Sequence, residues 1–259
     1  RHRATTLVHL AFNARPGRNR REIAAIRDSN LGMLKSVLDS CLRAGVGHFI
    51  YVSSHTVYGP HPDNAIPLPD TAPLRPLPDF PYGYDKFLSE QMIQEFGEQH
   101  QGLKITVLRA CVVLGPNADD PISKAFFRPV LMGVLDYNPP FQFLYEDDLA
   151  RVIGIIIGQE LPGVFNVAGE GVVFYKELAR IIKSKLINLP AVLAYPFVQL
   201  TWDLGIQRDS VASGLDLVRY PIVLDSGRLR QATGYKFWHT SLETLTSFAN
   251  SCLLVKEDN

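Results

Sequence analysis

The sequence has little cysteine, no net charge and no long apolar run, and each of these absences excludes a class of protein. Its three cysteines, Cys41, Cys111 and Cys252, are too few and too scattered for a disulfide framework or a metal site. We therefore predict no metal and a reducing, cytoplasmic setting. The 26 basic residues balance the 26 acidic ones, so a nucleic-acid partner held by bulk positive charge is not expected.

Membrane spans, leader peptides and disorder are also not expected from the composition. The apolar run at 152–157 is much shorter than the roughly 18 residues that a membrane helix needs. The first residues, RHRATT, do not follow the pattern of a signal peptide. Hydrophobic residues make up 46% of the chain and charged residues 20%, which is typical of a folded globular protein.

The first half of the chain alternates between apolar strand patterns and helical periodicity. Apolar residues recur at three- and four-residue steps through 21–44, which indicates an amphipathic helix that Gly45 ends. The complete pattern predicts strands at 6–12, 49–53 and 104–110 and helices at 21–44 and 82–100. Such an alternation predicts an α/β fold with a parallel sheet and right-handed crossovers.

The periodicity is looser after Gly115. It predicts helices at 122–132, 146–157, 174–185 and 242–253, a strand at 164–167, and a short helix at 225–233 closed by Gly234. We predict that residues 1–115 form the domain of the parallel sheet. Residues 116–259 then form a smaller, mostly helical lobe, with some segments returning to the sheet.

A long proline-rich segment separates the second predicted strand from the helix that follows it. Between Pro60 and Pro81 there are eight prolines, which block helix and interior strand alike. A plain linker is the ordinary interpretation of such a stretch. Because this one connects two elements of one sheet layer, we expect a functional loop over the face of the domain.

The segment Tyr82-Gly-Tyr-Asp-Lys86 places a phenol and an ammonium one helical turn apart, on the same face. A free tyrosine titrates at about 10, too high for a base at neutral pH, but a neighbouring ammonium stabilises the phenolate. The pair is therefore suited to general acid–base catalysis on a hydroxyl or carbonyl. The alternative is an ordinary surface pair.

A serine pair at the end of the second predicted strand favours the catalytic interpretation. Ser53 and Ser54 lie where ligands bind in open parallel sheets, at the carboxyl edge. Tyr82 opens the next helix, so its first turn lies at the same edge. The Ser54 hydroxyl is then placed to bind the substrate oxygen whose proton Tyr82 handles, whereas the alternative is a turn serine.

Taken together, these motifs resemble the extended short-chain dehydrogenase/reductases, the NAD-dependent epimerase/dehydratase family. The resemblance extends over nearly the whole chain and in the right order. It includes Val8-His-Leu-Ala11, Asn30, the SSHTVYG and YGYDK segments, LRACVVLGP, Phe143 to Ala150, Val164-Phe-Asn-Val-Ala-Gly169, and Leu229 to Tyr235. It implies a Rossmann-like parallel sheet and a C-terminal lobe that binds a small-molecule substrate.

The resemblance also implies a role for individual residues. Tyr82 would be the catalytic acid/base, Lys86 would tune it and bind the nicotinamide ribose, Ser54 would orient the substrate, and Asn30 would support the lysine or its water. Hydride would pass between the substrate and NAD or NADP. The residues lining the cofactor would be Leu10, Ala11, Phe12, Ser53, Tyr82, Lys86, Ala110 and Cys111.

Three positions depart from the family pattern. Dehydratases of the family carry an Asp-Glu pair after the serine, where this chain has His55 and Thr56, so sugar dehydration is not expected. Many epimerases have an asparagine where this chain has Val112, which is more typical of a substrate less polar than a standard nucleotide sugar.

The glycine-rich cofactor motif of the family, G-x-x-G-x-x-G, does not occur in this sequence. Residues 6–12 correspond to the family's fourth strand, which three strands and about 60 residues normally precede. We therefore expect an N-terminally truncated Rossmann domain with a bare edge strand, which binds dinucleotides weakly or not at all and tends to associate. Calorimetry with NAD(H) or NADP(H) tests this expectation.

Two other interpretations remain open: a cofactor-binding or sensing protein without catalysis, and an inactive fragment. The resemblance further implies a possible homodimer through the helices at 21–44 and 82–100. The substrate and the choice between NAD and NADP do not follow from the sequence.

Overall fold

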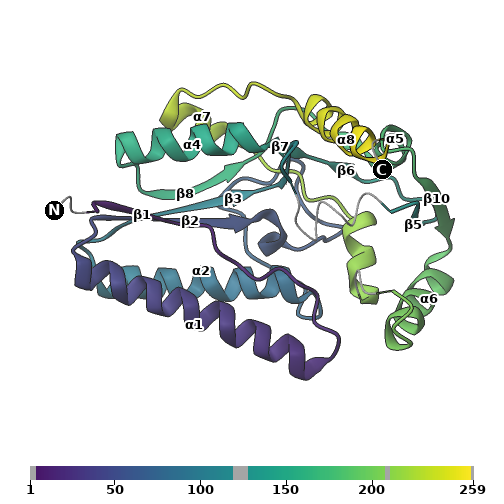
Figure 1. Cartoon of the computed structure of the whole chain (residues 1–259), viewed down its shortest axis with the longest axis horizontal. Helices are drawn as coiled ribbons and strands as arrows, with labels where there is room; N and C mark the ends of the chain where they lie inside the picture. Colours follow the sequence, from purple (N-terminus) through teal and green to yellow (C-terminus); the bar gives the residue numbers. More distant parts are fainter. Residues whose placement is uncertain (1–3, 119–127, 208–210, 258–259) are drawn as a thin grey trace.

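The computed structural model describes residues 4–118, 128–207 and 211–257. Its centre is a four-stranded parallel sheet in the order β1-β2-β3-β8. These strands span Thr6–His9, His48–Ser54, Lys104–Ala110 and Gly163–Val167. The structure thus confirms a Rossmann-like α/β fold, in which the carboxyl ends of the strands meet at one edge (Figure 1).

Helices α1 (Arg20–Ala44) and α2 (Pro81–Gln99) cover one face of this sheet (Figure 1). Alternate residues of a strand point to opposite faces, so Phe49 and Tyr51 of β2 point toward these helices. They pack against Leu34 and Leu38 of α1 and Ile93 of α2. An ion pair between Arg27 and Asp85, 2.6 Å from Nε to Oδ1, joins the two helices.

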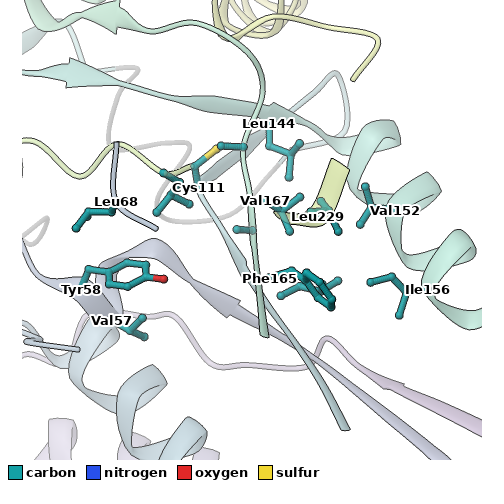
Figure 2. Packing of buried hydrophobic residues seen from close by; sticks show 14 of the residues in the cluster. Val57, Tyr58, Leu68, Cys111, Leu144, Val152, Ile156, Phe165, Val167 and Leu229 are labelled. Carbon is teal, nitrogen blue, oxygen red and sulfur yellow. The ribbon is translucent and has the colours of Figure 1, made fainter. Parts of the chain in front are cut away.

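The opposite face is covered by α4 (Glu146–Gln159) and α7 (Gly227–Thr233). Figure 2 shows Val152 and Ile156 of α4 and Leu229 of α7 packed near Phe165 of β8. Because both faces are covered, the central strands β2 and β3 consist mostly of buried residues. Segments after residue 115 thus return to the sheet.

The lobe beside the sheet combines helices with short strands (Figure 1). Its strands form pairs: β4 with β7, β5 with β10, and β6 with β9. Their bounds are Val112–Leu114, Phe143–Tyr145, Val130–Val134, Lys185–Leu189, Pro140–Phe141 and Val173–Phe174. The remaining helices are α5 (Tyr175–Ile181), α6 (Ala191–Asp203), α8 (Ser241–Glu257) and the 3₁₀ helix η2 (Ala212–Val218).

Two predicted helices need correction. The helix at 122–132 is wrong at its carboxyl end, where Val130–Val134 forms β5; residues 122–127 lie outside the described residues. The helix at 174–185 ends at Ile181, and β10 begins at Lys185 after a turn in which Lys183 has a positive φ of 57°. The first strand is also shorter than predicted, since it ends at His9.

The proline-rich segment is an irregular loop, as predicted. The middle of the loop is held at Leu68, whose backbone N–H donates to the Val223 carbonyl (2.6 Å) and whose carbonyl accepts from the Asp225 N–H (2.8 Å). Asn64 adds a side-chain bond to the Pro221 carbonyl. The loop therefore packs against the segment that leads from the lobe to α7.

Candidate active site

The first turn of α2 packs against the end of β2. A short 3₁₀ helix, η1 (His55–Tyr58), follows Ser54 directly, and Gly83 in α2 lies against its Thr56. A Cβ at Gly83 would come within 3.1 Å of three Thr56 atoms, so glycine permits the close approach. This contact brings the turn that carries Tyr82 to the predicted edge of the sheet.

Ser54 is buried at this edge and serves as the N-cap of η1. Its Oγ accepts hydrogen bonds from Thr56 Oγ1 (3.0 Å) and the Thr56 backbone N–H (3.3 Å), and His55 Nδ1 lies 3.5 Å away. Burial lowers the pKa of His55 to about 4, so its ring is neutral at neutral pH. The Ser54 hydroxyl thus lies among uncharged groups.

Tyr82 is partly exposed and packs edge-on against Phe12, with ring centroids 5.5 Å apart. Lys86 also lies against the Phe12 ring, with its Nζ 4.1 Å from the ring centroid. The structure thus places Phe12, Tyr82 and Lys86 together, although 70 residues of sequence separate the first two. The family resemblance had implied that all three belong to one site.

Lys86 is an almost fully buried cation. It is 4% exposed, its Nζ donates a 2.8 Å hydrogen bond to the Val52 carbonyl, and the Tyr51 ring centroid is 4.8 Å away. Loss of hydration lowers the pKa of Lys86 to about 7, while the charge of Glu90 acts in the opposite direction. A lysine in this state exchanges its proton near neutral pH.

Asn30 lies on α1 and is bonded to the chain that follows β1. Its Oδ1 accepts from the Asn13 backbone N–H (2.9 Å), and its Nδ2 donates to the Asn13 carbonyl (3.2 Å). Asn30 therefore fixes the segment that carries Leu10, Ala11 and Phe12. Its predicted role toward Lys86 or a water molecule stays a prediction.

The other predicted cofactor-lining residues differ in accessibility. Leu10 is 61% exposed and Ala11 is also exposed, whereas Ser53, Ala110 and Cys111 are buried. The Ser53 hydroxyl donates to Glu90 Oε1 at 2.5 Å. Burial raises the pKa of Cys111 to about 12, which is incompatible with a nucleophilic thiolate at neutral pH.

A buried polar cluster, which no sequence motif had indicated, lies behind the site. The Arg109 guanidinium binds the Glu90 carboxylate at 2.8 Å and the Tyr58 hydroxyl and Asp70 carbonyl at 2.9 Å each. Tyr58 in turn donates to Asn166 (2.7 Å). An arginine within an apolar strand was the available signal, because a buried charge requires a partner.

Within the described ranges, no three histidine, cysteine, aspartate or glutamate side chains gather as metal ligands do. In the same ranges, no helix has both the length and the apolar character that crossing a bilayer requires.

The arrangement of elements is shared with solved structures of sugar-nucleotide enzymes. UDP-glucose 4-epimerase of Thermotoga maritima, solved with UDP-glucose, superposes with a TM-score of 0.71 at 21% identity, over 98% of this chain and 79% of that one. dTDP-glucose 4,6-dehydratase of Bacillus anthracis, solved with NAD, gives 0.71 at 13% identity, over 98% and 74%. These similarities establish the fold.

Sequence comparison establishes the family. Residues 1–168 match the NAD dependent epimerase/dehydratase family, and the chain belongs to it. UDP-glucose 4-epimerase of Rhizobium meliloti (strain 1021) is 29% identical over 113 residues, 42% of this chain and 32% of that protein. An uncharacterized protein of Mycobacterium tuberculosis (strain ATCC 25618 / H37Rv) is 22% identical over 250 residues, 94% and 64%. The chain thus aligns with a third to two thirds of these relatives' lengths.

Proposed function

We propose that this chain carries the proton-transfer site of an NAD(P)-dependent oxidoreductase or epimerase that acts on a hydroxyl or carbonyl of a small substrate. The observation that carries the proposal is the buried Lys86 ammonium, one helical turn from Tyr82 and at the sheet edge where Ser54 lies. Burying a lysine is costly, and titratable groups with strongly perturbed pKa values cluster at functional sites.

The residues at this edge fit the nicotinamide half of NAD or NADP. Leu10 and Ala11 present an exposed apolar surface just beyond β1, suited to one face of a flat ring. Lys86 would bind a ribose hydroxyl, and Ser53, Ala110 and Cys111 would contribute backbone groups and small walls. When bound, the nicotinamide supplies the two-electron oxidation or reduction of a substrate carbon.

The protein's own groups then handle the proton and the oxygen. Ser54 holds the substrate oxygen through its hydroxyl, and Tyr82 takes the proton from an alcohol or returns it to a carbonyl. A cationic Lys86 lowers the energy of the Tyr82 phenolate by Coulomb attraction. Phe12 excludes water from the space between the two side chains, which strengthens that attraction.

Thr56 supports a reaction other than dehydration. Removing water from a sugar calls for an acid–base pair beside the serine, and Thr56 is buried with its hydroxyl bonded to Ser54. We therefore propose oxidation, reduction or epimerisation as the reaction class. Structurally similar enzymes have been solved with UDP-glucose and UDP-glucuronic acid, which makes nucleotide sugars the first substrate class to assay.

The proposal is tested with the Tyr82→Phe variant of the protein in the form that its host cell produces. Removing the hydroxyl deletes the proton carrier but keeps the ring against Phe12, so we expect kcat to fall by about 10²- to 10⁴-fold. Turnover is followed through the reduced nicotinamide with alcohols and ketones, and by product analysis with nucleotide sugars.

Tyr84→Phe is the matched control. Tyr84 lies two residues away on the same helix, where its ring packs against Phe87 and the Arg27 guanidinium. We expect its turnover to stay within about threefold of the parent protein. Equal turnover in Tyr82→Phe and Tyr84→Phe would contradict the proposal, and cofactor binding without turnover of any substrate would favour a sensing protein.

A further inference from the structure

Glu90 lies one helical turn beyond Lys86 and is buried with it. Its side chain is 7% exposed, and the two residues are spaced i, i+4 on α2, which puts them on one face of the helix. The proton chemistry proposed for Tyr82 and Lys86 assigns no role to this carboxylate. A buried carboxylate one helical turn from a buried lysine nevertheless stabilises the charged form of that lysine relative to its neutral form.

The carboxylate is fixed from two other elements. Arg109 on β3 binds it through Nε and Nη2, with the shortest contact at 2.8 Å, and Ser53 on β2 donates to Oε1 at 2.5 Å. The Arg109 side chain is itself only 9% exposed. Glu90 is therefore held in position, because any rotation would leave a buried guanidinium without its partner.

The groups that face Lys86 come from four segments. Glu90 lies on the same helix, His9 comes from β1, Tyr51 from β2, and the Phe12 ring from the segment between β1 and α1. Burial and the positive charge of Lys86 lower the pKa of His9, so that ring is neutral and adds no charge at neutral pH. Among these groups, Glu90 is the carboxylate that opposes the desolvation of Lys86.

The charges of the cluster also favour a phenolate. Lys86 and Arg109 bring two positive charges into the interior, and Glu90 brings one negative charge. A phenolate on Tyr82 would bring the sum to zero, whereas without Glu90 the lysine would lose its proton more readily. The carboxylate thus preserves the positive charge that the tyrosine needs.

We propose that Glu90 is a positioning residue of this site: clamped by Arg109 and Ser53, its carboxylate keeps the buried Lys86 side chain in its charged form. Its catalytic meaning rests on the function proposed above for Tyr82 and Lys86. The same clamp reaches the proline-rich loop, because Arg109 also binds the Asp70 carbonyl. Glu90 therefore joins the proton site to the loop that borders it.

The test is the titration of Lys86 by NMR, with lysine labelled at Cε and the resonance assigned with Lys86→Arg. We expect Glu90→Gln to lower the midpoint of the Lys86 titration by about one pH unit, because the amide keeps the shape but loses the charge. A residue that only supported the fold would lower the melting temperature and leave the midpoint unchanged.

Asp85→Asn is the matched control. Asp85 is a buried carboxylate of the same helix, next to Lys86 in sequence, but its partner is Arg27 on α1. We expect the Lys86 midpoint to be unchanged in this variant. Should Glu90→Gln not fold, the double variant Glu90→Gln/Arg109→Met removes both charges of the ion pair and is expected to show a smaller downward shift, because losing the positive charge of Arg109 offsets part of the effect.

An unchanged midpoint in a folded Glu90 variant, or an equal shift in Asp85→Asn, would overturn the proposal. The titration needs neither cofactor nor substrate, so its outcome is separate from the activity test. If Glu90→Gln lowers the midpoint of the Lys86 titration but Tyr82→Phe keeps its activity, the role of Glu90 toward Lys86 stands and the proposed catalytic function of Tyr82 is contradicted.

Discussion

A lysine ammonium inside a protein is stable only where other groups replace the water it has lost. Lys86 has one carbonyl acceptor, two aromatic rings and the charge of Glu90. These groups compensate only in part, because the pKa of Lys86 falls from its ordinary 10.5 to about 7. The site therefore holds a cation that reduces the stability of the fold at neutral pH.

This cost predicts a pH dependence of stability. Between pH 7 and 9 the unfolded chain keeps the Lys86 proton while the folded chain releases it, so stability rises with pH. Lys86→Met has no such proton. We expect the free energy of unfolding of the parent protein, relative to Lys86→Met, to increase by about 2 kcal/mol over this range. Urea unfolding at pH 7, 8 and 9 measures it, and parallel curves for the two proteins would contradict it.

At the scale of residues, local spacing was sufficient for part of the site. Tyr82 and Lys86 lie four positions apart on one helix, and Ser54 ends a recognisable strand. The pair of Glu90 and Arg109 could not be predicted in the same way. It depends on how α2 is rotated over β3, and the pattern of apolar residues does not fix that rotation.

At the scale of elements, the segment between β1 and α1 is irregular but held in place. Asn30 binds both backbone groups of Asn13 from the middle of α1. The helix is therefore a support for the part of this segment that contains Phe12 and Asn13. An asparagine whose side-chain carbonyl and NH₂ group both bind one residue fixes that residue in position and orientation.

Asn30→Ala should free this segment. We expect the Asn13 amide to exchange its hydrogen at least about tenfold faster and stability to fall by about 1–2 kcal/mol, since two hydrogen bonds are lost. Hydrogen-exchange NMR measures the first effect. Asn19→Ala is the control: Asn19 caps the same helix through the Glu22 N–H, so its loss weakens the first turn only. Equal exchange of Asn13 in both variants would exclude this role for Asn30.

Elements of the sheet were easier to predict than those of the lobe. The strands and helices of the first half alternate in a regular order along the chain, and each has a strong period. The lobe strands β5 and β10 are five residues each and pair across more than 50 positions of sequence. Pairings of this kind have no local signal, so residues 130–132 of β5 were wrongly predicted as the end of a helix.

At the scale of the whole molecule, one buried carboxylate joins α4 to the segment before α8. Asp148, fully buried in the first turn of α4, accepts hydrogen bonds from the Tyr235 hydroxyl and from the backbone N–H groups of Trp238 (3.0 Å) and His239 (3.2 Å). Arg151 reinforces the junction by lying 3.5 Å from the Trp238 ring centroid. The last part of the described chain is thus fastened to the helix that covers the sheet.

Asp148→Ala should loosen that junction and destabilise the whole fold. It leaves buried donors without an acceptor, which costs about 3 kcal/mol, and it should remove the exchange protection of the Trp238 and His239 amides. Asp147→Ala is a close control, because Asp147 lies in the same first turn and interacts equally with the helix dipole. Its side chain is 62% exposed and 4.0 Å from Arg151, so we expect a loss below about 1 kcal/mol. The difference between the two variants isolates the junction, and a difference near zero would mean that α4 and the final segment are held together by apolar packing alone.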